Sequence, residues 1–200
     1  VSGWSASGYV QIDTAPPVGS IVINNGASHT AVKGVTLALG SNDANAKMTL
    51  NNESAAVGPG GWVDHENSSG WDLDDSGPDG LRTVYYRLRD VALNYSDWYS
   101  DDIYLDRTAP SVPGVPVPDQ SLTNDTRPRW SWVASTEPPE AAGLDTTEAY
   151  EVKWWKEGSS TEFTVKRAVN DYTHTTALSD GTWKMQVRAE DAVGNISAWS

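Results

Sequence analysis

The strongest constraint on this chain is an internal repeat in its sequence. The segment Leu81–Trp98 reads LRTVYYRLRDVALNYSDW, and the segment Thr182–Trp199 reads TWKMQVRAEDAVGNISAW. The two segments align without a gap at an offset of 101 residues. The identical pairs are Asp79/Asp180, Gly80/Gly181, Arg87/Arg188, Asp90/Asp191, Asn94/Asn195, Ser96/Ser197 and Trp98/Trp199. Self-similarity at a fixed spacing indicates one structural unit used more than once, so we expect related tandem domains.

A second echo predicts where the domains begin and end. The sequence YSDDIYLDRTAP that follows Trp98 resembles SASGYVQIDTAP, which follows Trp4. Proline removes a backbone donor and ends strands, so each Thr-Ala-Pro tripeptide is expected to mark a joint. We therefore expect one domain over residues 14–106 and another over residues 107–200. Residues 1–13 are expected to be a terminal strand that belongs to a preceding repeat or to a neighbouring copy.

Apolar and polar residues alternate in many short segments of both halves. A period of two is typical of strands that bury one face, and no segment has a helical apolar period. The apolar sets expected in the core are Ile21/Ile23, Val35/Leu37/Leu39, Met48/Leu50, Val84/Tyr86/Leu88, Trp130/Trp132, Tyr150/Val152/Trp154 and Trp183/Met185/Val187/Ala189. Together with turn residues between the segments, this pattern predicts an all-β chain. We expect two tandem immunoglobulin-like β-sandwich domains of about seven strands each.

Several stretches resemble bacterial immunoglobulin-like and fibronectin type III-like repeats: LDRTAPSVPG, TNDTRPRWSW and the ending SDGTWKMQVRAEDAVGNISAWS. The resemblance covers nearly all of the second domain and the last third of the first, whereas residues 51–76 match poorly. Leu93 stands where such repeats usually carry the glycine that Gly194 retains. Repeats of this kind occur in tandem in large secreted and cell-surface proteins. The resemblance therefore implies an extracellular or cell-surface location and a structural or adhesive role, without implying one ligand.

Charge and composition exclude several classes of function. The 14 basic and 27 acidic residues give a formal net charge of −13, which opposes binding to nucleic acid and to anionic membranes. The chain has no cysteine and no apolar run of about 18 residues, so thiolate chemistry and membrane insertion are excluded. His29, His65 and His174 lie far apart, and no nucleophile-elbow, zinc-protease or phosphate-loop motif is present. We therefore expect no enzymatic activity.

Each copy of the repeat carries an aspartate, an asparagine four residues later and a tryptophan four residues after that. This repeat-turn motif is Asp90, Asn94 and Trp98 in the first copy and Asp191, Asn195 and Trp199 in the second. Aspartate accepts hydrogen bonds from turn amides and asparagine tolerates left-handed backbone, so turn formation is the favoured explanation. The alternative is metal ligation together with an acid at the joint such as Asp106.

Asp101, Asp102 and Asp106 are the candidate calcium ligands. They fall within six residues beside a proline-limited linker and resemble the interdomain acidic cluster of cadherins. Calcium prefers oxygen ligands, so we expect it to stiffen the joint through one or more of these carboxylates. The acidic stretch Asp72–Gly77 imitates the start of a calcium loop, but Thr83 stands where the motif needs a bidentate glutamate. We expect that stretch to be a solvated loop, and no other cofactor is implied.

Trp62, Trp71 and Trp155 are expected on loops or on the outward faces of strands. Exposed indole rings stack on sugar rings. The chain would then be an accessory carbohydrate-binding module of a secreted enzyme, with a polysaccharide or a cell-surface glycan as its partner. Packing beneath a loop or at the joint is the other outcome for these three residues, and it is the favoured one.

The two domains are expected to end differently. The strand Ile103–Asp106 follows Trp98, whereas only Ser200 follows Trp199, so the second domain is expected to lack its last strand. The segment that matches the missing strand is Tyr9, Val10, Gln11, Ile12 and Asp13. We therefore expect neighbouring copies or repeats to join head to tail by strand complementation in an extracellular stalk or filament. The alternative is a segment whose flanking strands were cut away.

Overall fold

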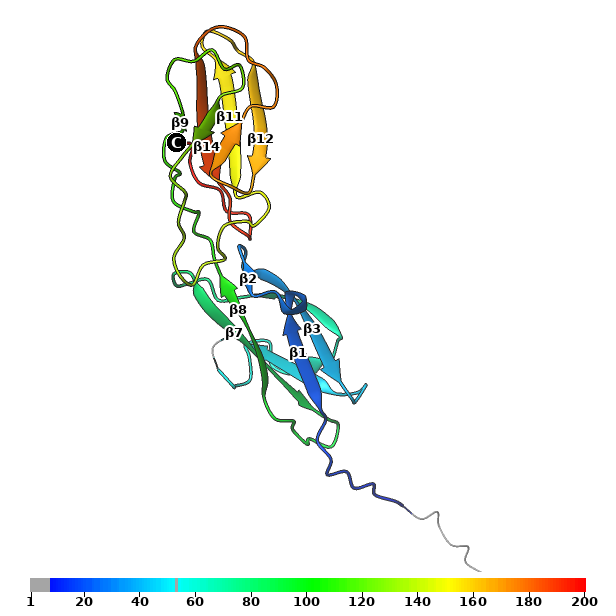
Figure 1. Cartoon of the computed structure of the whole chain (residues 1–200). Coiled ribbons are helices and arrows are strands. Elements are labelled where there is room, and N and C mark those ends of the chain that lie inside the picture. Colours follow the sequence, from blue (N-terminus) through cyan, green and yellow to red (C-terminus); the bar gives the residue numbers. More distant parts are fainter. Residues whose placement is uncertain (1–7, 53) are drawn as a thin grey trace, which may run out of the picture. The chain divides into compact units, whose positions relative to one another are not determined.

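The computed structural model describes residues 8–52 and 54–200, which fold almost entirely into β-strands joined by turns (Figure 1). The chain forms two compact units. The first contains the described residues up to Ala27 with Gly34–Ser76 and Arg82–Ile103, and the second contains Ser28–Lys33, Gly77–Leu81 and Tyr104–Ser200. Within the described ranges, no helix is long and apolar enough to cross a membrane.

The strands that precede Asp106 form two sheets. One sheet has the order β1-β3-β6, and β3 pairs antiparallel with both neighbours. The other has the order β2-β8-β7-β4-β5, in which β2 pairs with β8 in parallel and β4 pairs antiparallel with β7 and β5. The bounds are β1 Gly19–Ile23, β2 His29–Thr30, β3 Gly34–Ser41, β4 Lys47–Asn51, β5 Val63–Asp64, β6 Ser68–Asp72, β7 Gly80–Arg89 and β8 Tyr99–Leu105. A short 3₁₀ turn, Asn24–Gly26, follows β1.

Alternation along these strands sets the first core. On β3, Val35, Leu37 and Leu39 are buried, whereas the residues between them are exposed. Strand β7 buries alternate residues in the same way. One cluster joins the two sheets, and it includes Ile21, Ile23, Val35, Leu37, Leu39, Met48, Leu50, Val84, Tyr86, Leu88 and Ile103. The register expected from the sequence is confirmed for these strands. Each large apolar side chain so buried stabilises the fold by about 1.5–3 kcal/mol.

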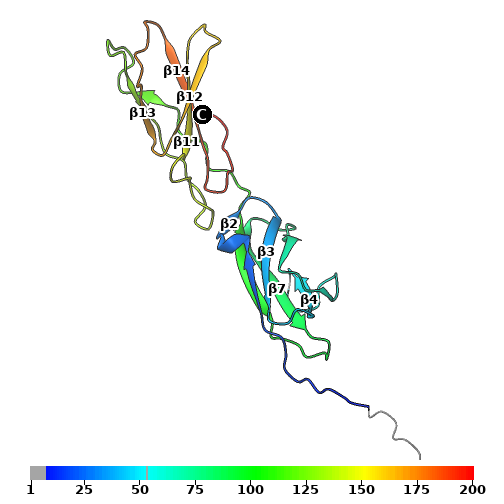
Figure 2. The ribbon, with the colours of Figure 1, turned by 90° about the vertical axis from the view of Figure 1, so that its right-hand side faces the viewer.

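The strands that follow Asp106 form two further sheets. One sheet has the order β13-β10-β9 and the other the order β12-β11-β14, with every pairing antiparallel. Figure 2 shows β13 in a different layer from β11, β12 and β14. The bounds are β9 Val117–Pro118, β10 Arg129–Ser131, β11 Tyr150–Lys156, β12 Glu162–Arg167, β13 Asp171–Thr173 and β14 Trp183–Ala189. This is the sandwich arrangement, with a core between two packed sheets.

The tryptophans fill the second core less completely than the alternation predicts. Trp132 is buried with Tyr150, Val152, Tyr172, Met185, Val187 and Ala189. Trp130 and Trp154 are half-buried and pack against that cluster. Trp183 is also half-buried, so the expectation that it lies in the core is wrong. It is the first residue of β14, and a strand end has fewer neighbours to cover an indole than a strand centre has.

Candidate cation site

The turn that follows β14 is held by the side chains of the repeat-turn motif. Asp191 Oδ1 accepts the backbone amides of Val193 and Asn195 at 3.0 and 2.8 Å. Its Oδ2 accepts Asn195 Nδ2 at 2.8 Å. Gly194 has a φ of 92°, in the left-handed region that suits glycine. These bonds account for both the aspartate and the asparagine of the motif.

The turn that follows β7 repeats this geometry in the first unit. Asp90 accepts the backbone amide and the side-chain Nδ2 of Asn94, both at 2.8 Å. Burial opposes ionisation of Asp90, but the hydrogen bonds from Asn94 outweigh it and lower the pKa of the carboxyl. Leu93 takes the place of glycine with a φ of 67°, which is costly for a side chain with a Cβ.

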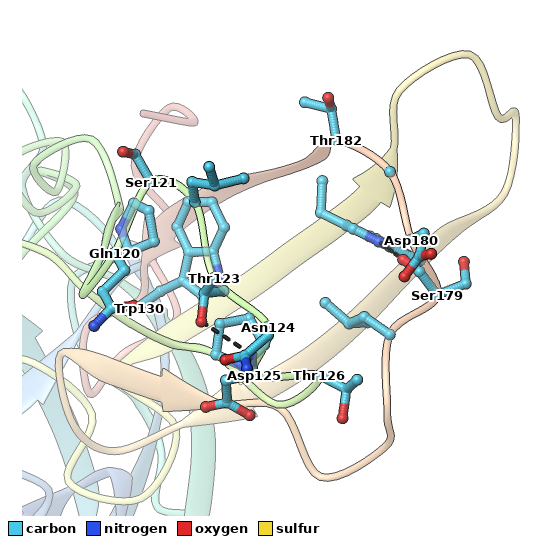
Figure 3. Close-up of a pocket in the computed structure, with 16 residues that line it drawn as sticks. Gln120, Ser121, Thr123, Asn124, Asp125, Thr126, Trp130, Ser179, Asp180 and Thr182 are labelled. Carbon is cyan, nitrogen blue, oxygen red and sulfur yellow. Dashed lines mark hydrogen bonds between the residues drawn. The ribbon is translucent and has the colours of Figure 1, made fainter.

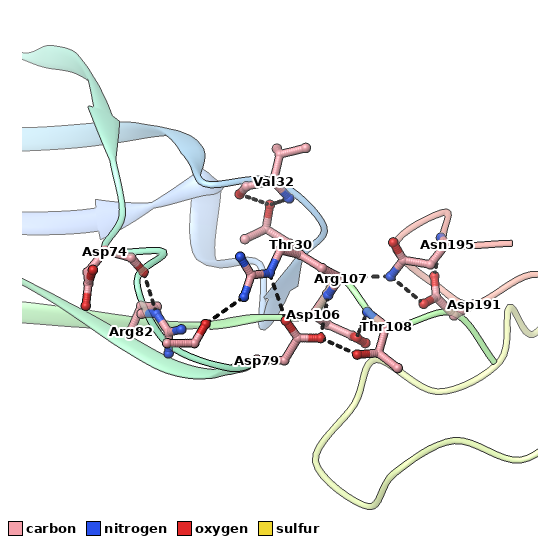
Figure 4. Close-up of polar contacts among 11 residues, drawn as sticks. Thr30, Val32, Asp74, Asp79, Arg82, Asp106, Arg107, Thr108, Asp191 and Asn195 are labelled. Atoms are coloured by element: carbon pink, nitrogen blue, oxygen red, sulfur yellow. Dashed lines mark hydrogen bonds and ion pairs between the residues drawn. The ribbon is translucent and has the colours of Figure 1, made fainter. Parts of the chain in front are cut away.

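Asp106 follows β8 and is joined to the Asp191 turn (Figure 4). Asn195 Nδ2 donates to the backbone oxygen of Asp106 at 3.0 Å as well as to Asp191. The carboxylate of Asp106 accepts the amide of Thr108 at 3.2 Å and that of Ala142 at 2.7 Å. Asp106 and Asp191 are each only 1% exposed. Both carboxylates are therefore buried, and amide groups supply their hydrogen bonds.

Glu137, in the loop between β10 and β11, brings a third carboxylate to the same place. One oxygen from each of Asp106, Glu137 and Asp191 lies within 4.8 Å of the other two. Both Glu137 carboxylate oxygens are buried and neither has a full hydrogen-bond partner. Burial raises the pKa of Glu137 to about 7, and the neighbouring charges of Asp191 and Asp106 add to the effect, while the Gly143 amide only weakly offsets it. The three carboxylates are therefore balanced either by a proton on Glu137 or by a bound cation.

A calcium ion fits the donor set of this cluster. Calcium takes oxygen ligands at about 2.3–2.6 Å in flexible geometry, so two ligands on opposite sides of the ion are about 5 Å apart at most. The spacing of the Asp106, Glu137 and Asp191 oxygens falls inside that limit. An ion there would give the Glu137 oxygens the partner that they lack. Without an ion, burial and the negative charges of Asp191 and Asp106 favour a proton on Glu137.

The structure places the three expected calcium ligands apart. Asp101 Oδ2 accepts the backbone amide of Ile23 at 2.7 Å, and Asp102 Oδ1 accepts the hydroxyl of Thr83 at 2.6 Å, so both serve the first unit. Asp106 alone joins a carboxylate cluster. The structure does bring Asp106 close to Asp191, as the alternative explanation of the repeat-turn motif requires. Glu137 was not singled out from the sequence, because one glutamate in a loop carries no sequence signal. The cluster is the one group of three such ligands found across residues 8–52 and 54–200.

A second anionic contact lies nearby in the second unit (Figure 4). Asp79 accepts the Arg107 side chain at 2.9 Å, the Arg107 amide at 2.8 Å and the Thr108 hydroxyl at 2.6 Å. Burial opposes the charge of Asp79, but the bonds from Thr108 and Arg107 prevail and lower its pKa to about 2. The Asp79 carboxylate already accepts hydrogen bonds from Arg107 and Thr108. It therefore fixes the segment after Asp106 and is not a candidate metal ligand.

The tryptophans that end each motif share one environment. The Arg87 guanidinium lies 5.4 Å from the centre of the Trp98 ring, and the Arg188 guanidinium lies 4.7 Å from that of Trp199. The Lys153 ammonium nitrogen also lies 4.7 Å from the centre of the Trp199 ring. Cation–π contacts of this kind stabilise by about 0.5–1 kcal/mol at exposed sites. The arginine matched between the two repeats therefore belongs to the motif, and it packs the tryptophan onto its strand.

The three candidate sugar-binding tryptophans are half-buried. Trp71 Nε1 donates to Asn52 at 2.6 Å and packs against the first core. The Trp62 ring has Arg89 over its face at 4.8 Å. Lys153 lies 5.7 Å from the Trp155 ring centre. Each ring thus has a partner within its own unit.

The expected assembly segment is exposed in the described chain. Tyr9, Val10 and Ile12 are 95%, 84% and 82% exposed, and no strand is formed there. Its last residue, Asp13, accepts Asn94 Nδ2 through its backbone oxygen at 3.0 Å. Asp106 receives the corresponding bond from Asn195, also at 3.0 Å. Asp13 in the first unit and Asp106 in the second therefore occupy equivalent positions.

Comparisons with known proteins concern the fold. No family model matches the chain, and no curated protein matches it in sequence. The FN1–FN3 domains of chicken CNTN1 match 97% of this chain at 14% identity with a TM-score of 0.48. A run of titin domains matches 93% at 13% identity with a TM-score of 0.50. This chain spans 66% and 64% of those two chains. With its sheets and cores, the chain has the fold of tandem immunoglobulin-like β-sandwich domains.

Proposed function

We propose that this chain is a non-enzymatic structural or adhesive repeat segment of an extracellular stalk or filament. The observation that carries the proposal is the repeated junction, in which Asp13 and Asp106 accept the same bond from Asn94 and Asn195. A bond that recurs within each unit supports a repeat in which every copy holds its entering segment in the same way. Arrays of this kind sum the stabilities of their units and interfaces.

Strand complementation is the proposed link between neighbouring copies or repeats. Strand β8 lies beside β7 and buries Ile103 and Leu105. In the described chain, β14 is an edge of its sheet, and the repeat aligns it with β7. By the equivalence of Asp13 with Asp106, Val10 and Ile12 match those two buried residues. Placing Tyr9–Asp13 of one copy beside β14 of another would bury them and pair an open edge.

This contact would be heterologous, because different surfaces of the two copies meet. It therefore propagates head to tail unless a ring closes. Ser200 already pairs with Val187 on the outer side of β14, through Ser200 N to Val187 O at 2.9 Å. An incoming strand must displace this segment or pair beyond it, towards Met185.

Sedimentation velocity over a concentration series tests the assembly. We expect concentration-dependent oligomers that are lost in the Val10→Asp/Ile12→Asp variant and on deletion of residues 1–13. Gln11→Asp adds one negative charge, half that of the double variant, on the opposite strand face and is the control, which should still assemble. A monomer at every concentration, or equal assembly by all four proteins, would contradict the proposal.

Calcium at Asp106, Glu137 and Asp191 is the proposed cofactor. It would cross-link the residue after β8, a loop and the turn after β14 within the second unit. Isothermal titration with calcium chloride measures this directly. We expect heat of binding in the wild-type protein and none in Glu137→Gln, which preserves the shape of the side chain. Binding that survives in Glu137→Gln would place the ion elsewhere, and its absence in both proteins would remove calcium from the proposal without affecting the assembly test.

A further inference from the structure

A cavity with two indole walls lies in the second unit, away from the cation site (Figure 3). Its volume is about 440 Å³, and it lies between the segment that follows β9 and the loop that leads into β14. Trp130 of β10 and Trp183 of β14 both line it. Trp183 Nε1 donates to the backbone oxygen of Ser179 at 2.9 Å, and Trp130 packs against the core. Both rings are thus fixed before any ligand arrives, which lowers the entropy cost of binding.

Exposed polar groups surround these rings. Gln120, Asn124 and Asp180 line the cavity, and all three residues are exposed to solvent. The neighbouring Thr123 and Asp125 are already engaged, because their side chains accept the amides of Asp125 and Arg127 at 3.0 and 2.8 Å. Amide and carboxylate groups beside aromatic faces match a molecule with hydroxyl groups around an apolar ring.

An adjoining cavity of about 500 Å³ shares Leu178, Ser179 and Trp183 with the first. Trp154 also lines it. His174 faces this second cavity, is only 3% exposed, and has no partner for its Nε2. Burial lowers the pKa of His174, so the ring is neutral at physiological pH. A buried ring nitrogen without a partner is costly unless a ligand or water reaches it.

We propose that these two adjoining cavities bind a neutral saccharide, with a sugar ring held between Trp130 and Trp183. The C–H face of a pyranose packs on indole rings, and its hydroxyl groups pair with Gln120, Asn124 and Asp180. No lysine or arginine lines either cavity, and the nearby Lys156 ammonium group is already bonded to Ser179 Oγ and the Asp180 backbone oxygen. Uronic and sulfated sugars would therefore meet the like charges of Asp125 and Asp180. The site shares no residue with the proposed calcium cluster, so these two proposals can fail separately.

Affinity electrophoresis and tryptophan fluorescence test the site on the full chain. The probes are soluble β-glucan, galactomannan and chitin hexamer as neutral sugars, with alginate as the acidic control. We expect at least one neutral probe to bind and alginate not to bind. Asn124→Ala and Asp180→Ala should each weaken binding about 3- to 10-fold, the usual effect of one lost hydrogen bond. Both residues are exposed, so these variants are expected to fold.

Trp155→Ala is the matched control, because Trp155 lines neither cavity. It should bind as the wild-type protein does, whereas Trp183→Ala should lose binding with its circular dichroism spectrum retained. The proposal is overturned if no neutral probe binds, if alginate binds as well as the neutral sugars, or if Trp155→Ala abolishes binding while Asn124→Ala and Asp180→Ala leave it unchanged.

Discussion

The turn at Asp90 and the turn at Asp191 are built from the same bonds. In each turn, the asparagine amide and its Nδ2 donate to the aspartate at 2.8 Å. The same Nδ2 also donates at 3.0 Å to the backbone oxygen of Asp13 in the first unit and of Asp106 in the second. The conformation of the turn is therefore a property of the repeated sequence.

The surroundings of the two turns differ. Glu137 stands beside Asp106 and Asp191, whereas no third ligand group joins Asp13 and Asp90 within the described residues. Asp13 is exposed and Asp106 is buried. One added loop carboxylate thus separates a turn that only folds the chain from a turn that belongs to a cluster of three carboxylates. The comparison shows that a repeat-turn motif alone does not make a cation site.

The largest expected effect comes from removing the turn aspartates. Asp90→Ala and Asp191→Ala each leave several amide donors without an acceptor, which should cost about 2–4 kcal/mol in the free energy of unfolding. Without calcium, Asp191→Ala should be the milder change, because it also removes repulsion on Glu137. With calcium, the order should reverse. Urea denaturation with and without calcium measures both. Equal calcium responses in the two variants would break the comparison.

The next effect is a dependence of stability on pH. It should come from the cluster of Asp106, Glu137 and Asp191, because the turn at Asp90 has no counterpart of Glu137 among the described residues. The pKa of Glu137 rises from 4.5 to about 7 in the folded chain. The folded state therefore holds a proton that the unfolded state releases between these values. Without calcium, the contribution of Glu137 is full below pH 4.5 and is lost as the pH rises through 7.

Glu137→Gln removes this loss and serves as the reference curve. His174 acts in the opposite sense, because its lowered pKa makes the folded state less stable as the pH falls below about 6.5. It contributes equally to both proteins, so the difference between their curves isolates Glu137. Calcium should flatten the wild-type curve. Parallel curves for the wild-type protein and Glu137→Gln would show that Glu137 does not titrate in this range.

Much of the fold was predictable because it depends on local patterns. Alternation gave the buried faces of β3 and β7, and the aligned repeat gave the two equivalent turns. Trp183 follows the same alternation, yet it is only half-buried, because position within a strand also decides how many neighbours cover a ring. Periodicity reports which face a residue shares and does not report how near it lies to the end of the sheet.

The candidate sites were less predictable because they join distant loops. Asp101, Asp102 and Asp106 are close in sequence, but a strand turns successive side chains to opposite faces and spaces them along its length. Only Asp106 lies beyond the strand end, where the Asp191 turn and the Glu137 loop meet it. The paired cavities at Trp130 and Trp183 likewise depend on loop placement, which no spacing in the sequence encodes.

A smaller effect concerns the backbone of the two turns. Leu93 has a φ of 67° and is 58% exposed, so its side chain adds little burial while its Cβ strains the turn. Leu93→Gly should stabilise the first unit by about 0.5–1 kcal/mol. Gly194→Ala should destabilise the second unit by about 1 kcal/mol, since its φ of 92° excludes a Cβ. Thermal unfolding of both variants checks these signs, and a destabilising Leu93→Gly would mean that the leucine side chain contributes contacts that outweigh the strain.

The smallest expected effect comes from the two carboxylates that lie near Asp106 in sequence. Asp101 and Asp102 each accept one hydrogen bond in the first unit, from Ile23 N and from the Thr83 hydroxyl. Asparagine retains an acceptor oxygen, so Asp101→Asn and Asp102→Asn should change the free energy of unfolding by less than about 1 kcal/mol. Calcium affinity should stay within about twofold of the wild-type value, because a removed charge outside the cluster is largely screened by salt. A tenfold loss of affinity in either variant would place the ion beside these residues, and Glu137 would then no longer explain how the two turns differ.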